Sequence, residues 1–263
     1  MSVRKIQSVL ILLTLLLSVP YAHAERGGDE FSAEPELSFA ADRPGFGDAT
    51  STLPAMRLAL EAGASQSFQE GRLDLELPQL LLRFGLSSWA EIRLQVPSLN
   101  LPVDADDVPV GRAGGVGFKM ALAPHDLVQL SWVSNFVIPV AELARGESLF
   151  GWTSTLNMGA QLTPTFALNA TFAGALSYAF DSEDSAFDWE LGGALGLSGS
   201  FDATTVFAEG IAVGKDRDTM RVALALGLAQ MLTPTFQLDF SFEYDLPGYG
   251  DATRVGLGVA TLF

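Results

Sequence analysis

Residues 235–246 read Thr-Phe-Gln-Leu-Asp-Phe-Ser-Phe-Glu-Tyr-Asp-Leu, so that apolar and polar side chains alternate along the whole stretch. A period of two is typical of a β-strand with two unlike faces. The same pattern ends the chain, where the odd positions from 253 to Phe263 are mostly apolar and the even positions, apart from Leu262, are small or charged. Such strands suit a transmembrane β-barrel, in which one face of each strand meets lipid and the other meets the lumen.

The orientation of 235–246 follows from the cost of burying charge in lipid. We expect Phe236, Leu238, Phe240, Phe242 and Tyr244 to face lipid, because the opposite orientation would place three acids in hydrocarbon at a cost of roughly several kcal/mol.

The N-terminus carries the features of a secretory signal. Arg4 and Lys5 precede an apolar run from Val9 to Val19, and Ala22-His23-Ala24 forms a small-x-small cleavage site. The run is shorter than the roughly 20 residues that a membrane span needs, which favours a cleaved signal over an anchor. The absence of Cys excludes a lipoprotein anchor and a disulfide framework.

Composition narrows the class of protein further. The formal net charge is −16, and removal of the signal would make it more negative, which argues against nucleic-acid binding. Hydrophobic residues make up 48% of the chain, yet no later apolar run is long enough for a spanning helix. A soluble β protein and a membrane barrel both remain compatible with this composition, and the alternating segments favour the barrel.

Twelve segments have strand character. They are expected at about 54–68, 71–86, 89–98, 113–122, 126–140, 150–162, 166–180, 186–200, 204–214, 220–232, 235–246 and 252–263. An even number places both termini on one side of the membrane. We therefore expect a signal peptide at 1–24, a periplasmic N-terminal extension at 25–52 and an up-and-down antiparallel barrel at 53–263.

The connections support this count because short and longer links alternate. The longer set is expected at Leu99–Arg112, Glu142–Leu149, Asp181–Ser185, Lys215–Thr219 and Pro247–Asp251. Gln161-Leu162-Thr163-Pro164-Thr165-Phe166 recurs as Leu232-Thr233-Pro234-Thr235-Phe236, which indicates either repeated hairpins or similar turn chemistry. In 71–86 the alternation changes phase at Pro78, where a bulge would keep both halves facing lipid.

The same orientation argument assigns charged residues to the lumen. The candidates are Arg57, Glu61, Arg72, Asp74, Glu76, Arg83, Glu91, Arg93, Lys119, Asp188, Glu190, Arg221, Asp239, Glu243, Asp245 and Arg254. Glu209 has apolar neighbours that fit either face, so the sequence does not show whether its side chain faces lipid or the lumen. Two interpretations are open: a basic wall on the first strands facing an acidic wall, which would create a transverse field, or local ion pairs that stiffen the lumen.

Residues for catalysis and metal binding are scarce. His125 is the one histidine that would outlast signal removal, and it lies in an expected short turn. This pattern favours neither a Ser-His-Asp triad nor a zinc site, so we expect no catalytic residues, no cofactor and no metal. The acidic groups Asp104, Asp106, Asp107 and Asp181, Glu183, Asp184 suit weak cation binding or simple solvation.

One motif carries a family resemblance. Asp42-Arg43-Pro44-Gly45-Phe46, followed by Thr52-Leu53-Pro54 and Leu60-Glu61-Ala62-Gly63, resembles the family of phenol-degradation meta-pathway transporter-like outer-membrane proteins. Ala41 stands where that family usually has Thr, and Ala55 where a Gly commonly follows the Pro. The resemblance implies an outer-membrane barrel, often called a transporter and sometimes found with aromatic degradation. It implies no chemistry for the motif itself.

Two roles for the motif remain open. Arg43 could pair with a lumen acid and hold the extension as a partial plug, or the segment could only fasten the N-terminus to the periplasmic rim.

The sequence thus predicts a barrel of the Gram-negative outer membrane, in contact with lipid, that passes small solutes, including hydrophobic or aromatic ones, by diffusion. We expect the strand ending at Phe263 to be recognised by the barrel-assembly machinery. A sealed structural or surface-interaction barrel is the first alternative, and a barrel enzyme acting on lipid or peptide is the second. A soluble β-sandwich is the third.

Overall fold

A computed structural model of the chain describes residues 39–43, 45–103, 110–111, 114–124, 127–138, 148–180, 186–215 and 219–263. The expected signal at 1–24 lies outside the described residues, as do Pro44, His125 and the acidic groups at 104–107 and 181–184.

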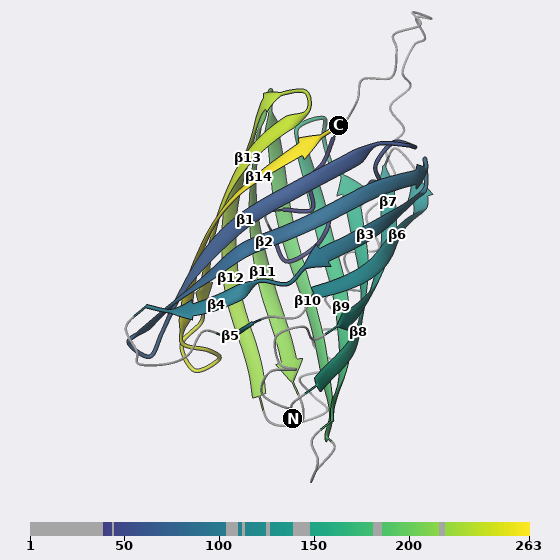
Figure 1. Cartoon of the computed structure of the whole chain (residues 1–263). Helices are drawn as coiled ribbons and strands as arrows, with labels where there is room; N and C mark the ends of the chain where they lie inside the picture. Colours follow the sequence, from purple (N-terminus) through teal and green to yellow (C-terminus); the bar gives the residue numbers. More distant parts are fainter. Residues whose placement is uncertain are drawn as a thin grey trace, which may run out of the picture. The chain divides into compact units, whose positions relative to one another are not determined.

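The chain forms a closed antiparallel barrel of twelve strands (Figure 1). The strands are β1 (Leu58–Gln69), β2 (Arg72–Ser87), β3 (Ala90–Val96), β4 (Leu99–Pro102), β5 (Val110–Gly111), β6 (Gly114–Pro124), β7 (Val128–Ile138), β8 (Ser148–Gln161), β9 (Phe166–Phe180), β10 (Ala186–Phe201), β11 (Thr204–Lys215), β12 (Thr219–Thr233), β13 (Phe236–Asp245) and β14 (Ala252–Leu262). From β6 to β14 each strand pairs with the next along the chain, β3 pairs with β2 and β6, and β1 pairs with both β2 and β14, which closes the wall.

The short strands β4 and β5 explain why fourteen elements make a twelve-stranded wall. β4 pairs with β2 in the same register as β3 does, with Leu77 opposite Leu99 and Leu80 opposite Val96. β5 likewise pairs with β4 in the register that β6 keeps with β3. The expectation that Leu99–Arg112 is a long connection is therefore wrong near both ends, because Leu99–Pro102 and Val110–Gly111 are strands that keep the registers of β3 and β6.

The predicted phase change at Pro78 is confirmed. Gly63 pairs with Gln79 and Ser65 pairs with Glu76, so Leu77 and Pro78 together face Ala64. An extra residue of this kind is a β-bulge, and it keeps Glu76 and Gln79 on the same face of the strand.

The outer surface is apolar around the barrel, as the strand patterns predict. On β12, Leu224, Leu226 and Leu228 are exposed, and on β13, Leu238 and Phe240 are exposed. The polar residues between them face inward, including Asp239 and Asp245, which are 4% exposed. Apolar side chains that face outward on every side suit a lipid solvent.

No helix among the described residues has the length and apolar character to cross a membrane.

Candidate functional site: the barrel lumen

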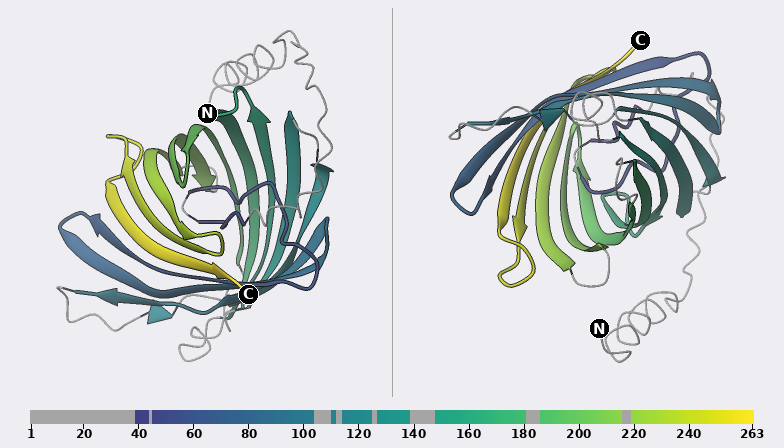
Figure 2. Two further views of the ribbon diagram at one scale, coloured as in Figure 1. Left: turned by 90° about the horizontal axis from the view of Figure 1, so that it is seen from above. Right: turned by 60° about the horizontal axis from the view of Figure 1, so that its bottom comes forward.

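Residues 39–53 lie inside the barrel, and we call them the inner segment (Figure 2). The sequence placed residues 25–52 in a periplasmic extension, whereas the described part of that range crosses the lumen. It starts beside the end of β14, where Phe39 and Leu53 pack with Ala59, Ala260 and Leu262.

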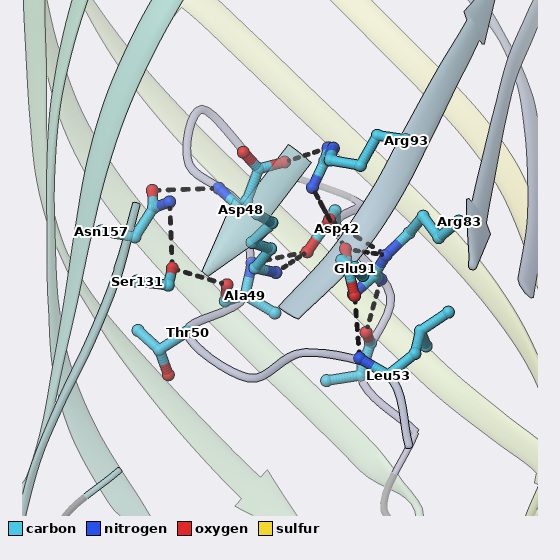
Figure 3. Close-up of polar contacts among 12 residues, drawn as sticks. Asp42, Asp48, Ala49, Thr50, Leu53, Arg83, Glu91, Arg93, Ser131 and Asn157 are labelled. Carbon is cyan, nitrogen blue, oxygen red and sulfur yellow. Dashed lines mark hydrogen bonds and ion pairs between the residues drawn. The ribbon is translucent and has the colours of Figure 1, made fainter. Parts of the chain in front are cut away.

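Asp42 lies at the centre of a group of buried ion pairs and hydrogen bonds (Figure 3). Its Oδ1 accepts hydrogen bonds from Lys119 Nζ at 2.8 Å and from the backbone N–H of Ala49 at 2.9 Å. Its Oδ2 accepts one from Arg93 Nη1 and lies 3.3 Å from Arg83 Nε. Three basic side chains from β2, β3 and β6 thus converge on one carboxylate of the inner segment.

Two acids of the barrel wall, Glu61 and Glu91, bind both Arg83 and the backbone of the inner segment. Glu61 accepts hydrogen bonds from the backbone N–H of Asp42 at 3.0 Å and from Arg83 Nη1 at 2.8 Å. Glu91 accepts from Arg83 Nε at 2.8 Å and from the backbone N–H of Leu53 at 2.8 Å. Glu91 therefore fixes the far end of the inner segment to the same wall as its start.

Burial and neighbouring charge set the protonation of the two segment acids. Burial alone would raise the pKa of Asp42, but Arg83, Lys119 and Arg93 outweigh it and hold the pKa below its usual value. Burial and the negative charge of Asp42 raise the pKa of Asp48, against the opposing effect of Arg93. We call the whole set the Asp42 cluster, and its members are Asp42, Asp48, Glu61, Arg83, Glu91, Arg93 and Lys119.

Arg43 points to a different part of the wall. Its Nη1 donates to Gln79 Oε1 at 2.7 Å, and its Nε lies 3.6 Å from Asp239 Oδ1. The guanidinium lies over Gly63 and Gly258, which face each other across β1 and β14. A Cβ at either position would come within 2.7 Å of the Arg43 side chain, so the glycines provide the space that it occupies. The contact between Arg43 and a lumen acid that the sequence suggested is present.

Phe46 anchors the inner segment on the side of β10, β11 and β12. Its ring packs against a buried apolar cluster from these three strands and lies close to Gly192. Its backbone N–H donates to Glu209 Oε2 at 3.0 Å. The side chain of Glu209, which the sequence could not orient, therefore faces the lumen.

The segment then returns along β9, β8 and β7. Gly47 sits so close to Thr171 that a Cβ on Gly47 would collide with its hydroxyl. The backbone N–H of Asp48 donates to Asn157 Oδ1 at 3.2 Å, and Ser131 Oγ donates to the carbonyl oxygen of Ala49 at 3.3 Å. Together with the contacts above, the inner segment touches all twelve strands of the wall.

A second charged group lies on β12 to β14, and no ion pair among the described residues joins it to the Asp42 cluster. Arg254 Nη1 donates to Glu243 Oε1 at 2.6 Å and to Asp245 Oδ1 at 3.0 Å. Arg221 also binds both acids, with Nε 2.7 Å from Asp245 Oδ1. The charges of this group pair locally, which agrees with the second of the two interpretations of the lumen charges.

A cavity of about 260 Å³ remains between the inner segment and the wall. Its lining comes from the segment and from β1, β2 and β11 to β14, and the polar and aromatic members are Arg43, Phe46, Ser65, Gln79, Phe207, Ser241, Phe242, Glu243 and Arg254.

The sequence assigned sixteen charged residues to the lumen. The strand pairing places all of them except Arg57 on the inner face, and Arg57 lies in the turn before β1 with an exposed side chain. Asp188 and Glu190 lie on the inner face of β10. Gln79, Asn157, Phe207 and Glu209 were not predicted. Of these, Gln79 had a usable signal in the phase change at Pro78.

Among the described residues, no group of three His, Asp or Glu side chains is arranged to hold a metal ion.

Solved outer-membrane barrels resemble this chain in fold. The COG4313 outer membrane channel from Pseudomonas putida F1 matches with a TM-score of 0.60 and 13% identity, covering 84% of this chain and 99% of that one. The NanC porin matches with a TM-score of 0.54 and 11% identity over 77% and 98%. The translocator domain of the autotransporter NalP from Neisseria meningitidis matches with 0.51 and 12% over 78% and 88%. No family model and no curated protein sequence matches the chain. At these identities the likeness establishes the fold, a β-barrel of the outer-membrane type.

Proposed function

We propose that the chain is an outer-membrane channel through which small solutes diffuse. The cavity of about 260 Å³ that the inner segment leaves beside β11 to β14 carries this proposal, because a barrel built only for support would have no need of polar space there. The apolar outer surface supports insertion in lipid. The resemblance of the Asp42–Phe46 motif supports a relation to the phenol-degradation transporter-like family, and with it a preference for aromatic solutes.

The proposal includes the processing and assembly expected from the sequence. A signal peptide at 1–24 would direct the chain across the inner membrane, and the strand ending at Phe263 would be recognised by the barrel-assembly machinery. No catalytic step is part of the proposal.

Flux into liposomes that carry the refolded protein tests the channel. Folding is checked first by heat-modifiable migration in a gel. We expect ions and small aromatic solutes to enter faster than in empty liposomes, and a disaccharide to enter much more slowly. If folded protein gives no flux of any solute, the channel proposal is wrong.

A sealed structural barrel is the second candidate, and one observation favours it. The inner segment touches every strand and buries six of the seven charged groups of the Asp42 cluster, which stiffens the wall. Absence of flux together with normal folding would support this candidate.

A further inference from the structure

The cavity beside the inner segment has the features of a binding site for a small carboxylate with a flat apolar body. This inference rests on the proposed channel function and specifies the solute for which it selects.

The first observation is hydrogen-bonding capacity that the protein leaves unused. Within the described part of the chain, Arg43 Nε is buried without a hydrogen bond and lies 3.6 Å from Asp239 Oδ1, whereas Nη2 makes only a long contact of 3.5 Å with the carbonyl oxygen of Leu257 and keeps donor capacity for a ligand. Arg43 has a side chain 21% exposed and lines the cavity. A planar guanidinium with free donors binds a carboxylate with two parallel hydrogen bonds.

The second observation is a second guanidinium in the same cavity. Arg254 is bound to Glu243 and Asp245 through Nη1 only, and its side chain is 35% exposed. Of the charged residues that line the cavity, Arg43 and Arg254 are basic and Glu243 alone is acidic. The other acids that pair with these bases, Asp239 at 3.6 Å from Arg43 and Asp245 at 3.0 Å from Arg254, are 4% exposed, so the charged groups open to a ligand are two bases and one acid.

The third observation is the apolar part of the lining. Phe46 is fixed against the cluster on β10 to β12, and the ring of Phe207 is fixed over Gly227, where a Cβ would collide with it. Two rigid rings beside two guanidinium groups fit a molecule with an apolar body and an acidic head. The volume of about 260 Å³ is large enough for a single ring with one short substituent.

We infer that Arg43 and Arg254 bind the carboxylate of such a solute while Phe46 and Phe207 contact its apolar body. The position of Arg43 is fixed as well, because the Asp42 cluster binds the preceding residue to β2, β3 and β6. The donor group is therefore presented at a fixed place in the lumen.

Current through single channels in planar bilayers tests the inference. The probes are benzoate, acetate, which lacks the apolar body, and benzyl alcohol, which lacks the charge. With chloride as the carrier ion, we expect benzoate to reduce the current in a saturable way at lower concentrations than either of the other two.

Two variants separate binding from a displaced inner segment. Arg43→Gln is expected to weaken the benzoate effect by about 10-fold or more, as for the loss of a hydrogen bond to a charged group, and Arg43→Lys to restore part of it. Phe207→Ala changes the wall and leaves the segment's own anchors intact. It should weaken the benzoate effect while the acetate effect stays the same.

The outcomes distinguish the two proposals. Wild-type protein that is folded but carries no current would overturn the channel function itself. A conducting wild type in which benzoate shows no saturable effect, or in which both variants respond to benzoate as the wild type does, would overturn the binding site and leave the channel intact.

Discussion

Replacing Asp42 by Asn tests whether the Asp42 cluster holds the inner segment in place. The substitution keeps the shape of the side chain and removes the charge that Lys119, Arg93 and Arg83 share. Removing one partner from a buried ion pair costs about 3–5 kcal/mol when it leaves the other charge uncompensated. Here the cluster holds four acids and three bases, so Asp42→Asn leaves equal numbers of each.

This balance places the expected loss at the lower end of that range, at about 3 kcal/mol. The measurement is unfolding by denaturant in detergent, followed by tryptophan fluorescence, with the midpoint converted to a free energy of unfolding. Asp202→Asn is the matched control, since Asp202 lies in an exposed turn with φ of 51°, a conformation that Asn tolerates. We expect the control to change the free energy by less than about 0.5 kcal/mol.

The dependence of this loss on pH follows from the sign of the pKa shift. Because the folded pKa of Asp42 lies below its usual value of 3.8, its contribution is present above pH 3.8 and is lost as the pH falls toward the folded pKa. The difference between wild type and Asp42→Asn should therefore shrink below that pH. A loss no larger than that of the control at neutral pH would show that the cluster does not hold the segment.

Three further results are expected from other parts of the structure. The folded pKa of Asp48 is raised above 3.8, so the folded state takes up a proton and stability should fall as the pH rises above 3.8; Asp48→Asn should flatten this slope in unfolding curves measured across pH. A Cβ at Gly85 would collide with a backbone carbonyl of the chain leaving the lumen, so Gly85→Ala should cost about 1–3 kcal/mol in the same unfolding assay, whereas Gly210→Ala, with no atom nearer than 3.9 Å, should not. Leu226→Arg at the middle of β12 should cost about 2–4 kcal/mol and Met220→Arg near its end about 0–1, and equal costs at both depths would contradict insertion in a bilayer.

The barrel could be predicted from sequence because the alternation of polar and apolar residues is visible within each strand by itself. In β13 each residue differs in polarity from the next, so the strand and its lipid-facing side follow from ten residues alone. The bulge at Pro78 was predictable for the same reason, since a change of phase is visible within one strand.

The inner segment could not be predicted because its contacts are distant in sequence. Asp42 and Lys119 are 77 residues apart, and residues 39–53 have no periodic pattern that shows which wall they will meet. The orientation of Glu209, on the barrel wall, also could not be predicted from the sequence. Its own strand is apolar on both faces, and only the backbone of Phe46 shows that the carboxylate faces the lumen. The family motif marked the right residues but gave no reason for their position.

The covalent link between the inner segment and β1 has a consequence for assembly. β1 closes the barrel against β14, its partner from the opposite end of the chain, and the segment that fills the lumen directly precedes it. The pairing of β1 with β14 and the contacts of the inner segment with the last strands can therefore form only after the last strand has been made. Sealing the seam and filling the interior are coupled steps, and a variant that slows one of them should delay the maturation of the whole barrel.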